Sequence, residues 1–249
     1  MALPKIQLPK YQVNMLTSDR TIWIRPFTVK EEKIILMASE GTNTDISVAL
    51  LQIIENCIVD DDVDVENLPF FECIYLFLNI KKISTSEEIK IAFKDQSDPN
   101  NKIEAYCNLN NDIIINNLDL YKNEKDYNLI QLSNNDIYLR IKPLLYKDYI
   151  RLMKMSDKTK NDKTSEINLV YSALLLTLKE IYDKESTYNP NEYTLEELSS
   201  FYEDISFKDK DKIKKVYENL PSINLKFHYI ENGVEKEKIV DDISADFLM

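Results

Sequence analysis

A run of carboxylates between residues 60 and 66 is the first candidate for chemistry in this sequence. Its members are Asp60, Asp61, Asp62, Asp64 and Glu66. Their D-x-D-x-D spacing is that of a calcium loop, in which carboxylate oxygens surround the ion. Such a loop needs glycine at its sixth position and a bidentate glutamate at its end, but Val65 and Phe71 stand there. We therefore expect a solvated loop without a metal, whose charge could meet a basic surface of a partner protein.

Candidates for nucleophilic catalysis are few. His228 is the only histidine, so a Ser-His or Cys-His mechanism would have to use it. It falls in a predicted strand with no partner identified by spacing, and a packing or surface role is favoured. The cysteines Cys57, Cys73 and Cys107 are odd in number and contain no CxxC pair. This pattern predicts reduced, buried thiols, no cofactor and no enzyme; a metal-dependent hydrolase is the alternative, without a site to support it.

Glycine is rare, and its rarity excludes several enzyme classes. Gly41 and Gly233 are the two glycines in 249 residues, whereas nucleotide-binding loops and nucleophile elbows need clustered glycines. The formal net charge of −12, from 31 basic and 43 acidic residues, argues against binding to nucleic acid or to an anionic membrane. No run of about 18 apolar residues and no signal-peptide core is found. We expect the protein to stay in the cytoplasm where it is made.

The N-terminal residues predict a hairpin followed by helices. Residues 11–24 alternate apolar side chains in two short stretches separated by a polar turn, which is typical of antiparallel strands. Thr28 precedes an apolar periodic stretch and Glu31 follows three residues later, the spacing of a capping box. Periodicity predicts two further helices, over residues 46–57 and about 68–80.

The second half of the chain repeats this order. YNLIQLSNNDIYLRIKP, from residue 127, matches YQVNMLTSDRTIWIRP, from residue 11, with one residue inserted in the turn. Both halves end in a further predicted hairpin, over about 88–109 and 223–240. We expect an α+β protein of two tandem related modules, 1–120 and 125–249, each a β-hairpin, three helices and a β-hairpin. The alternative is two unrelated halves that share common motifs.

Alternation in each N-terminal hairpin directs some side chains away from the core. Ile22 and Ile24 share one strand face, so Trp23 lies on the other. The matching strand of the second module carries Tyr138 and Arg140. Because aromatic and arginine side chains are enriched at binding hot spots, we predict a partner-binding surface; burial of the strands on both faces is the alternative. Its residues are Trp23, Arg25, Tyr138 and Arg140, joined by the acidic Asp60, Asp61, Asp62 and Asp64.

The first 95 residues contain several unusual motifs. They are Ala2 to Lys5, Arg25 to Phe27, Val29 to Lys33 and the block ENCIVDDDVDVENLPFFECIYLFLNIK. In these motifs the chain resembles the T-even (T4-like) myophage baseplate protein family. Some relatives bear cysteine knuckles on hairpins, but Cys107 stands alone here, so a structural zinc is not carried over. Cross-strand pairs must instead hold the two later hairpins together. The aromatic residues available for such pairs are Phe93, Tyr106, Phe227 and Tyr229.

The resemblance implies a structural subunit of the baseplate hub region in a contractile phage tail. Its partners would be other tail and baseplate proteins, with no nucleic acid and no membrane, and its location would be the virion, after assembly in the host cytoplasm. One alternative is a hub assembly chaperone that is absent from the mature virion. Another is an acidic protein that binds a basic host factor.

Overall fold

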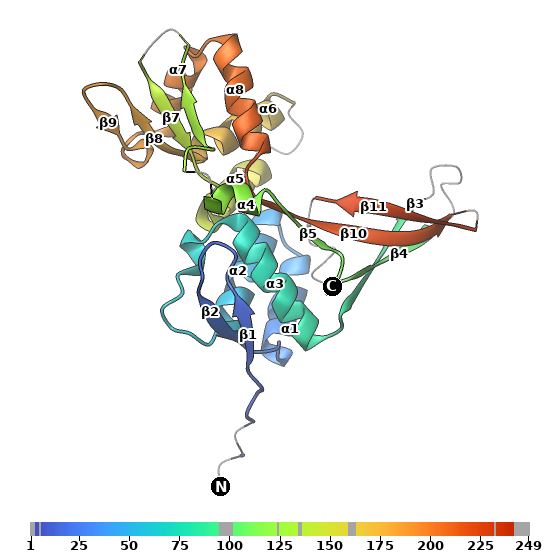
Figure 1. The fold of residues 1–249 in the computed structure, drawn as a ribbon. Coiled ribbons are helices and arrows are strands. Elements are labelled where there is room, and N and C mark those ends of the chain that lie inside the picture. Colours follow the sequence, from blue (N-terminus) through green and yellow to red (C-terminus); the bar gives the residue numbers. More distant parts are fainter. Residues whose placement is uncertain are drawn as a thin grey trace. The chain divides into compact units, whose positions relative to one another are not determined.

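The computed structural model describes residues 3–4, 6–94, 102–123, 125–133, 136–158, 163–231 and 233–241. These residues form helices and antiparallel sheets, so the predicted α+β class is confirmed (Figure 1). The chain divides into two compact units. Unit 1 comprises residues 1–65, 71–115 and 223–249, and unit 2 comprises residues 66–70 and 116–222.

Unit 1 begins with the predicted hairpin. Strands β1 (Tyr11–Asn14) and β2 (Thr21–Ile24) pair antiparallel, and Ile22 and Ile24 face the core with 0% and 1% of their surface exposed. The next elements are α1 (Val29–Ser39), α2 (Asn43–Cys57), the short 3-10 helix η1 (Val65–Asn67) and α3 (Phe70–Ser84). The Thr28 hydroxyl and the Glu31 carboxylate form the predicted capping box, which satisfies amide groups at the start of α1.

Helix α3 supplies much of the core of unit 1. Its apolar side chains are buried almost all round, as expected for a helix that is enclosed on every side. The fully covered members are Cys73, Leu76, Phe77, Leu78 and Ile80. Among the described residues, no helix is both long and apolar enough to cross a bilayer.

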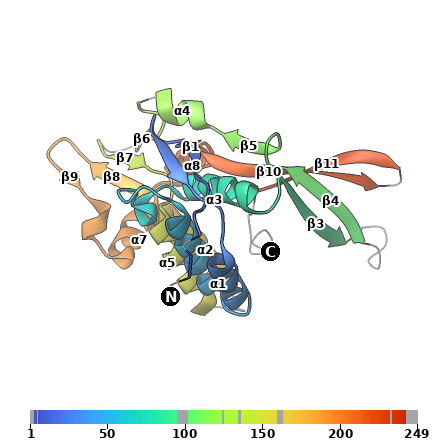
Figure 2. The ribbon, with the colours of Figure 1, turned by 90° about the horizontal axis from the view of Figure 1, so that it is seen from below.

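The second part of unit 1 is a sheet whose strands come from distant parts of the chain. It contains β3 (Glu88–Lys94), β4 (Lys102–Asn108), β5 (Ile113–Asn116), β10 (Ser222–Glu231) and β11 (Val234–Val240). Their order is β11-β10-β4-β3, with β5 also on β10, so the two hairpins lie side by side (Figure 2). The predicted aromatic pairing occurs between Phe93 and Tyr229, whose rings are 5.1 Å apart and edge to face.

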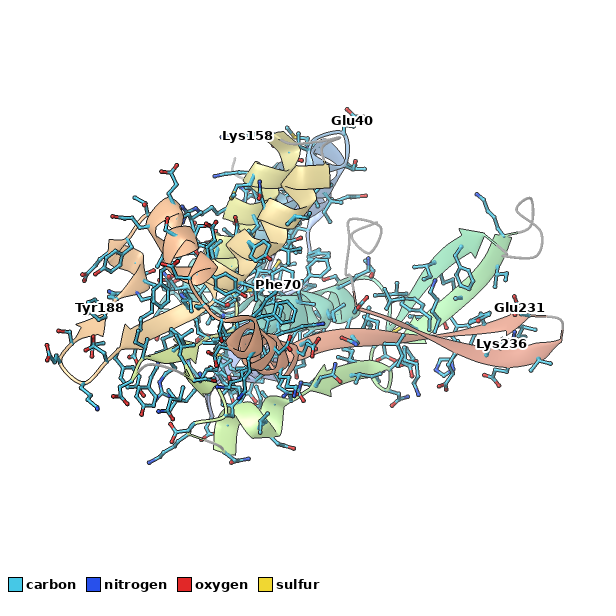
Figure 3. All side chains as sticks on the ribbon, turned by 90° about the horizontal axis from the view of Figure 1, so that it is seen from above. Glu40, Phe70, Lys158, Tyr188, Glu231 and Lys236 are labelled. Atoms are coloured by element: carbon cyan, nitrogen blue, oxygen red, sulfur yellow. The ribbon has the colours of Figure 1, made fainter. Side chains whose placement is uncertain are left out.

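The tip of the β10–β11 hairpin depends on its glycine. Gly233 has a φ of 76°, in the left-handed region that side chains disfavour. Next to this turn, Lys236 pairs with Glu231 across the two strands (Figure 3). The turn therefore keeps β11 in register with β10, from Leu225 opposite Val240 to Glu231 opposite Val234.

Unit 2 packs helices on a small sheet. Its order is β6-β7-β8-β9. Buried apolar side chains of the strands, α6, α7 and α8 form one core, in which Leu139 and Ile141 are almost completely covered. The elements are α4 (Leu118–Asn123), β6 (Leu129–Gln131), β7 (Tyr138–Ile141), α5 (Tyr146–Lys158), α6 (Lys163–Leu176), β8 (Leu178–Tyr182), β9 (Thr187–Tyr188), the 3-10 helix η2 (Pro190–Glu192), α7 (Leu195–Glu203) and α8 (Phe207–Glu218).

The observed units differ from the predicted modules 1–120 and 125–249. Residues 223–240 belong to unit 1, because β10 pairs with β4 through His228 opposite Tyr106 and Tyr229 opposite Ala105. The second half also contains β8, β9 and α8, which the pattern of three helices between hairpins does not include. The α6 stripe ends early, since Leu178 lies in β8 and not in the helix. Tandem duplication itself stays a prediction.

Two local arrangements recur in the two units. In unit 1 the Arg25 amide donates to the Cys57 carbonyl at 2.8 Å, and in unit 2 the Lys142 amide donates to the Thr177 carbonyl at 2.7 Å. In each unit the donor follows the first hairpin and the acceptor lies at the end of the second helix, where Cys57 is the last residue of α2 and Thr177 comes just after α6. Two related modules would be expected to share such a backbone hydrogen bond.

The second recurrent arrangement is a buried carboxylate that holds the hairpin turn. The two oxygens of Glu72, on α3, accept the amide protons of Leu16 and Thr17 at 2.8 and 2.7 Å. Asp209, on α8, likewise accepts the amide and hydroxyl of Ser133. Glu72 is fully buried and Asp209 is 3% exposed. Each carboxylate fastens one hairpin to one helix inside its own unit, and sequence reasoning missed both.

The three cysteines are reduced and buried, as predicted. Burial raises the pKa of Cys57 and of Cys107 to about 12, and raises the pKa of Cys73 well above its usual value. Since the thiolate is the reactive form, we expect none of the three to react with Ellman's reagent in the native protein. All three should react within seconds in denaturant. Rapid native modification of even one thiol would contradict the structure.

Candidate interaction surface

The predicted surface residues of unit 1 lie beside one another. Trp23 is 41% exposed, so it does face away from the core. Its amide donates to Asp60 at 2.5 Å, and its carbonyl accepts the Val59 amide at 2.8 Å. The start of the acidic run therefore lies along the edge of β2, next to the exposed indole.

The rest of the acidic run forms a solvated loop, in agreement with its predicted character. Asp61, Asp62 and Asp64 are exposed. Arg20 donates to Asp62 at 2.5 Å, and this bond holds the pKa of the Asp62 carboxyl below its usual value. Among the residues that the structure describes, no group of three or more His, Cys, Asp or Glu side chains is arranged to hold a metal ion.

Arg25 contributes to the fold of unit 1. Its guanidinium donates to both carboxylate oxygens of Glu31, at 3.0 and 3.3 Å, and to the Pro26 carbonyl at 3.0 Å. Its side chain is only 20% exposed. The same Glu31 carboxylate caps α1, so the arginine joins the end of β2 to the start of that helix. A partner-binding role for Arg25 stays a prediction.

Tyr138 and Arg140 are half-buried on β7 of unit 2. The Tyr138 ring stacks on Tyr182 of β8, with centroids 5.1 Å apart and planes 8° from parallel. Arg140 donates to the Lys125 carbonyl at 3.1 Å and lies 3.4 Å from Glu180. The arginine is thus held along the sheet by several acceptors, and Tyr138 belongs to an aromatic face that continues onto β8.

His228 joins segments of the unit 1 sheet. Its Nε2 lies 3.1 Å from the Asp112 carboxylate, and its ring stacks on Tyr106 at 5.6 Å. Burial raises the pKa of Asp112, but the hydrogen bond from the Asn108 amide and the contact with His228 outweigh it and leave that pKa below its usual value. The backbone carbonyl of Asp112 also accepts the Lys226 amide at 2.9 Å. This arrangement ties the end of β4 to β10, the packing role expected for the histidine.

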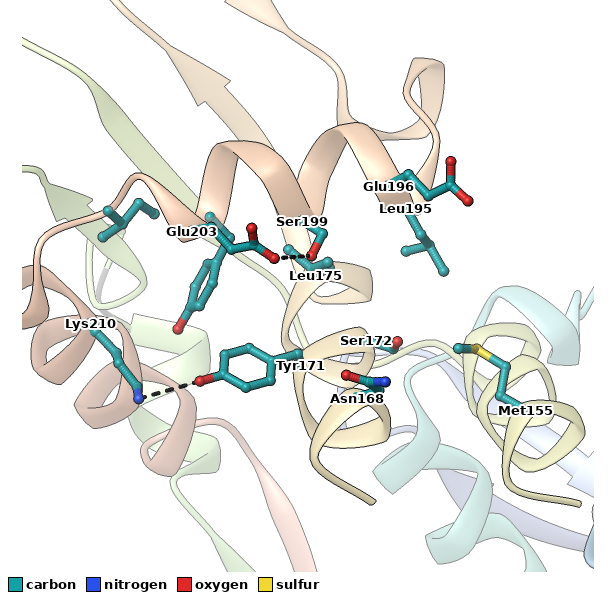
Figure 4. A pocket seen from close by; sticks show the side chains of 12 residues that line it. Met155, Asn168, Tyr171, Ser172, Leu175, Leu195, Glu196, Ser199, Glu203 and Lys210 are labelled. Atoms are coloured by element: carbon teal, nitrogen blue, oxygen red, sulfur yellow. Dashed lines mark hydrogen bonds between the residues drawn. The ribbon is translucent and has the colours of Figure 1, made fainter. Parts of the chain in front are cut away.

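Sequence reasoning missed a groove in unit 2. It has a volume of about 710 Å³ and lies between α6 and α7, with α5 and α8 at its ends (Figure 4). Apolar and aromatic side chains form most of its lining, and Glu196, Ser199 and Glu203 stand along the α7 side. The lining residues are Met155, Asn168, Tyr171, Ser172, Leu175, Leu195, Glu196, Ser199, Tyr202, Glu203, Ile205 and Lys210.

Two tyrosines and a lysine shape one end of the groove. Tyr171 and Tyr202 meet edge to face with centroids 5.7 Å apart. Lys210 lies 3.5 Å from the Tyr171 hydroxyl and 5.8 Å from the ring centroid. Burial is the main reason that the pKa of Tyr202 is raised, so this phenol stays neutral. Along α7, the Ser199 hydroxyl donates to the Glu203 carboxylate at 3.3 Å (Figure 4). The arrangement suits an apolar segment that carries a hydrogen-bonding group.

Comparison with known protein families gives a match over most of the chain. A family model described as T4 bacteriophage base plate protein matches residues 8–249. No curated protein and no solved structure matches the chain. The family match covers nearly the whole chain and extends well beyond the first 95 residues that carry the motif resemblance.

Proposed function

Because the chain belongs to the T4 bacteriophage base plate protein family, we propose that it is a structural subunit of the hub region of a contractile tail. The observation that carries this proposal is the extent of the match, which runs from residue 8 to residue 249 and includes parts of both compact units. The family implies a place in the virion tail. The subunit would join the baseplate in the host cytoplasm, through contacts with other tail and baseplate proteins.

The groove of unit 2 supports a docking role. Its floor is apolar, and burial of apolar surface yields about 25 cal/mol per Å². Exposed Glu196 and Glu203 on α7 stand at its polar side, which would select against acidic segments. A neighbouring baseplate protein that inserts an apolar segment here would bury the groove without any large change in this chain.

The net negative charge of the chain argues against nucleic acid and anionic membranes as partners. With a formal net charge of −12, the chain would repel phosphates, because affinity for nucleic acid depends on Lys and Arg that neutralise them. Exposed carboxylates such as Asp61 and Asp64 would instead speed association with basic protein surfaces. We therefore propose a role in assembly by protein contacts, without catalysis, cofactor or membrane.

The composition of purified virions tests this function. For a structural subunit, quantitative mass spectrometry of mature particles should give a fixed copy number, and cryo-EM of the baseplate should contain density for both units. A protein present in infected cells but absent from mature particles would overturn the structural role. That second result is the one expected of a hub assembly chaperone.

A further inference from the structure

Residues 3–4 and 6–10 belong to an arm that precedes β1. The described residues of this arm belong to no helix or strand, and the arm leads away from the helices of unit 1 (Figure 1). Leu3 and Ile6 are 91% and 88% exposed. Such exposure of two large aliphatic side chains on one short segment is typical of an interaction site.

The sequence of the arm has the properties of a peptide ligand. It contains the triplet Leu-Pro-Lys twice, at residues 3–5 and 8–10. Proline fixes φ and biases the preceding residue toward an extended conformation, so the arm loses little entropy when it binds. Two lysines and no acidic residue make this segment basic, in a chain whose net charge is −12.

Unit 2 contains a pocket of complementary character, which we name the tyrosine pocket. Its volume is about 410 Å³. Tyr188 and Tyr193, at its rim, are 38% and 41% exposed, and Tyr188 lies on the β8–β9 hairpin (Figure 3). Aromatic-lined grooves are the usual sites for extended proline-containing peptides. The lining residues are Ile137, Ile181, Tyr182, Asp183, Tyr188, Tyr193, Glu197, Leu198 and Phe201.

The two carboxylates of the tyrosine pocket are held in place by bonds within unit 2. Asp183 accepts the Glu185 and Ser186 amides at 2.8 Å, and it accepts the Tyr188 hydroxyl at 3.2 Å. Glu197 accepts the Thr194 amide at 2.8 Å. These hydrogen bonds hold the pKa of both carboxyls below their usual values. Both are therefore ionised at neutral pH, at fixed positions beside aromatic rings.

We propose that the tyrosine pocket binds the Leu-Pro-Lys arm of a second copy of this chain. A leucine and proline would fill the apolar lining, and the lysine that follows would lie near Asp183 or Glu197. A second copy is the occupant because its arm exposes Leu3 and Ile6 and carries apolar and basic side chains, which complement the apolar lining and the two carboxylates of the pocket. This inference does not depend on the proposed role in the virion.

A labelled peptide of residues 1–10 tests the pocket, by fluorescence anisotropy with the full-length chain. Binding should be saturable, and Tyr188→Ala and Tyr193→Ala should each weaken it by about tenfold or more. Tyr106→Ala, a tyrosine of similar exposure on the unit 1 sheet, is the matched control and should bind normally. A peptide with Leu3→Ser and Leu8→Ser should not bind. Absence of binding, or equal binding to all three tyrosine variants, would overturn the proposal.

Sedimentation of the full-length chain tests whether the occupant is a second copy. The apparent mass should rise with protein concentration, and removal of residues 1–10 or addition of free peptide should abolish the rise. Circular dichroism should show the same fold with and without these residues, because they precede β1. Peptide binding by a chain that stays monomeric at every concentration would also overturn the proposal, since the arm would then bind within its own molecule.

Discussion

Replacement of Glu72 by alanine is expected to destabilise unit 1 by about 3 kcal/mol or more. The Glu72 side chain is fully buried, and its two oxygens accept the amide protons of Leu16 and Thr17 at 2.8 and 2.7 Å. Each hydrogen bond to a charged acceptor contributes about 1.5 to 3 kcal/mol, and the alanine variant also leaves amide groups of the hairpin turn without their acceptor. Because the two sides lie 55 and 56 residues apart in sequence, no local structure replaces the lost contact.

Denaturant unfolding of the two-unit chain, followed by fluorescence of the single tryptophan, measures the effect. Trp23 lies on the hairpin that Glu72 holds, so its signal reports on unit 1. Glu72→Gln retains one acceptor oxygen and should give an intermediate loss. Glu32→Ala, on the exposed side of α1, should change the free energy of unfolding by less than about 0.5 kcal/mol. Equal midpoints for Glu72→Ala and Glu32→Ala would refute the role of this carboxylate.

A second large effect is expected at low pH, through Glu31. Burial raises the pKa of this carboxyl, but hydrogen bonds from Arg25 and Thr28 outweigh the burial and lower the pKa from 4.5 to about 2. A carboxyl whose pKa is lower in the folded state stabilises the fold above the unfolded pKa. Its contribution should therefore be complete above about pH 4.5 and should disappear as the pH falls to about 2. The size of the loss is about 3 kcal/mol, from about 1.4 kcal/mol per pKa unit.

The pH dependence of unfolding separates Glu31 from other carboxylates. The difference in unfolding free energy between the natural chain and Glu31→Gln should be large at pH 6 and should approach zero near pH 2. Glu197→Gln is the matched control, because Glu197 makes the same capping box with Thr194 but is exposed. Its difference should be much smaller. A Glu31→Gln difference that stays constant from pH 6 to pH 2 would show that the ionised carboxyl does not stabilise the fold.

Local patterns predicted the elements whose stabilising contacts are close in sequence. The alternation of residues 11–24 gave the first hairpin, and the spacing of Thr28 and Glu31 gave the start of α1, where both side chains do cap the helix. The helix predicted from the apolar stripe of residues 46–57 was correct, because that face of α2 packs into the core. In each case the residues that form the sequence pattern are the same residues whose contacts stabilise the element.

Elements with mixed or interrupted patterns escaped prediction. Helix α8 has the sequence FKDKDKIKKVYE, in which Ile213 and Asp209 are the buried residues, so its apolar face is too small to recognise. Leu178 continues the spacing of α6, but the chain leaves the helix after Leu176 because β8 pairs with β7. Neither the charge-rich helix nor this early ending has a signal within a short window.

In the candidate interaction surface, too, features with a local sequence signal were predicted and features that depend on distant residues were not. Alternation correctly placed Trp23 on the exposed face of its strand. The internal bonds of Arg25 and Arg140 could not be predicted, because Glu31, Asn128 and Glu180 become neighbours only in the folded units. The groove and the tyrosine pocket combine side chains from several helices and strands, so their lining has no contiguous sequence signature.

The pairing of β10 with β4 has a consequence for the order of synthesis. Unit 1 contains residues 1–65, 71–115 and 223–249, while unit 2 lies between its second and third parts. The ribosome must therefore complete unit 2 before the last strands of unit 1 emerge, a delay of roughly 6 to 25 s at usual elongation rates. During that interval β4 presents an open edge to other chains. Two nascent subunits on one polysome could therefore pair through this edge.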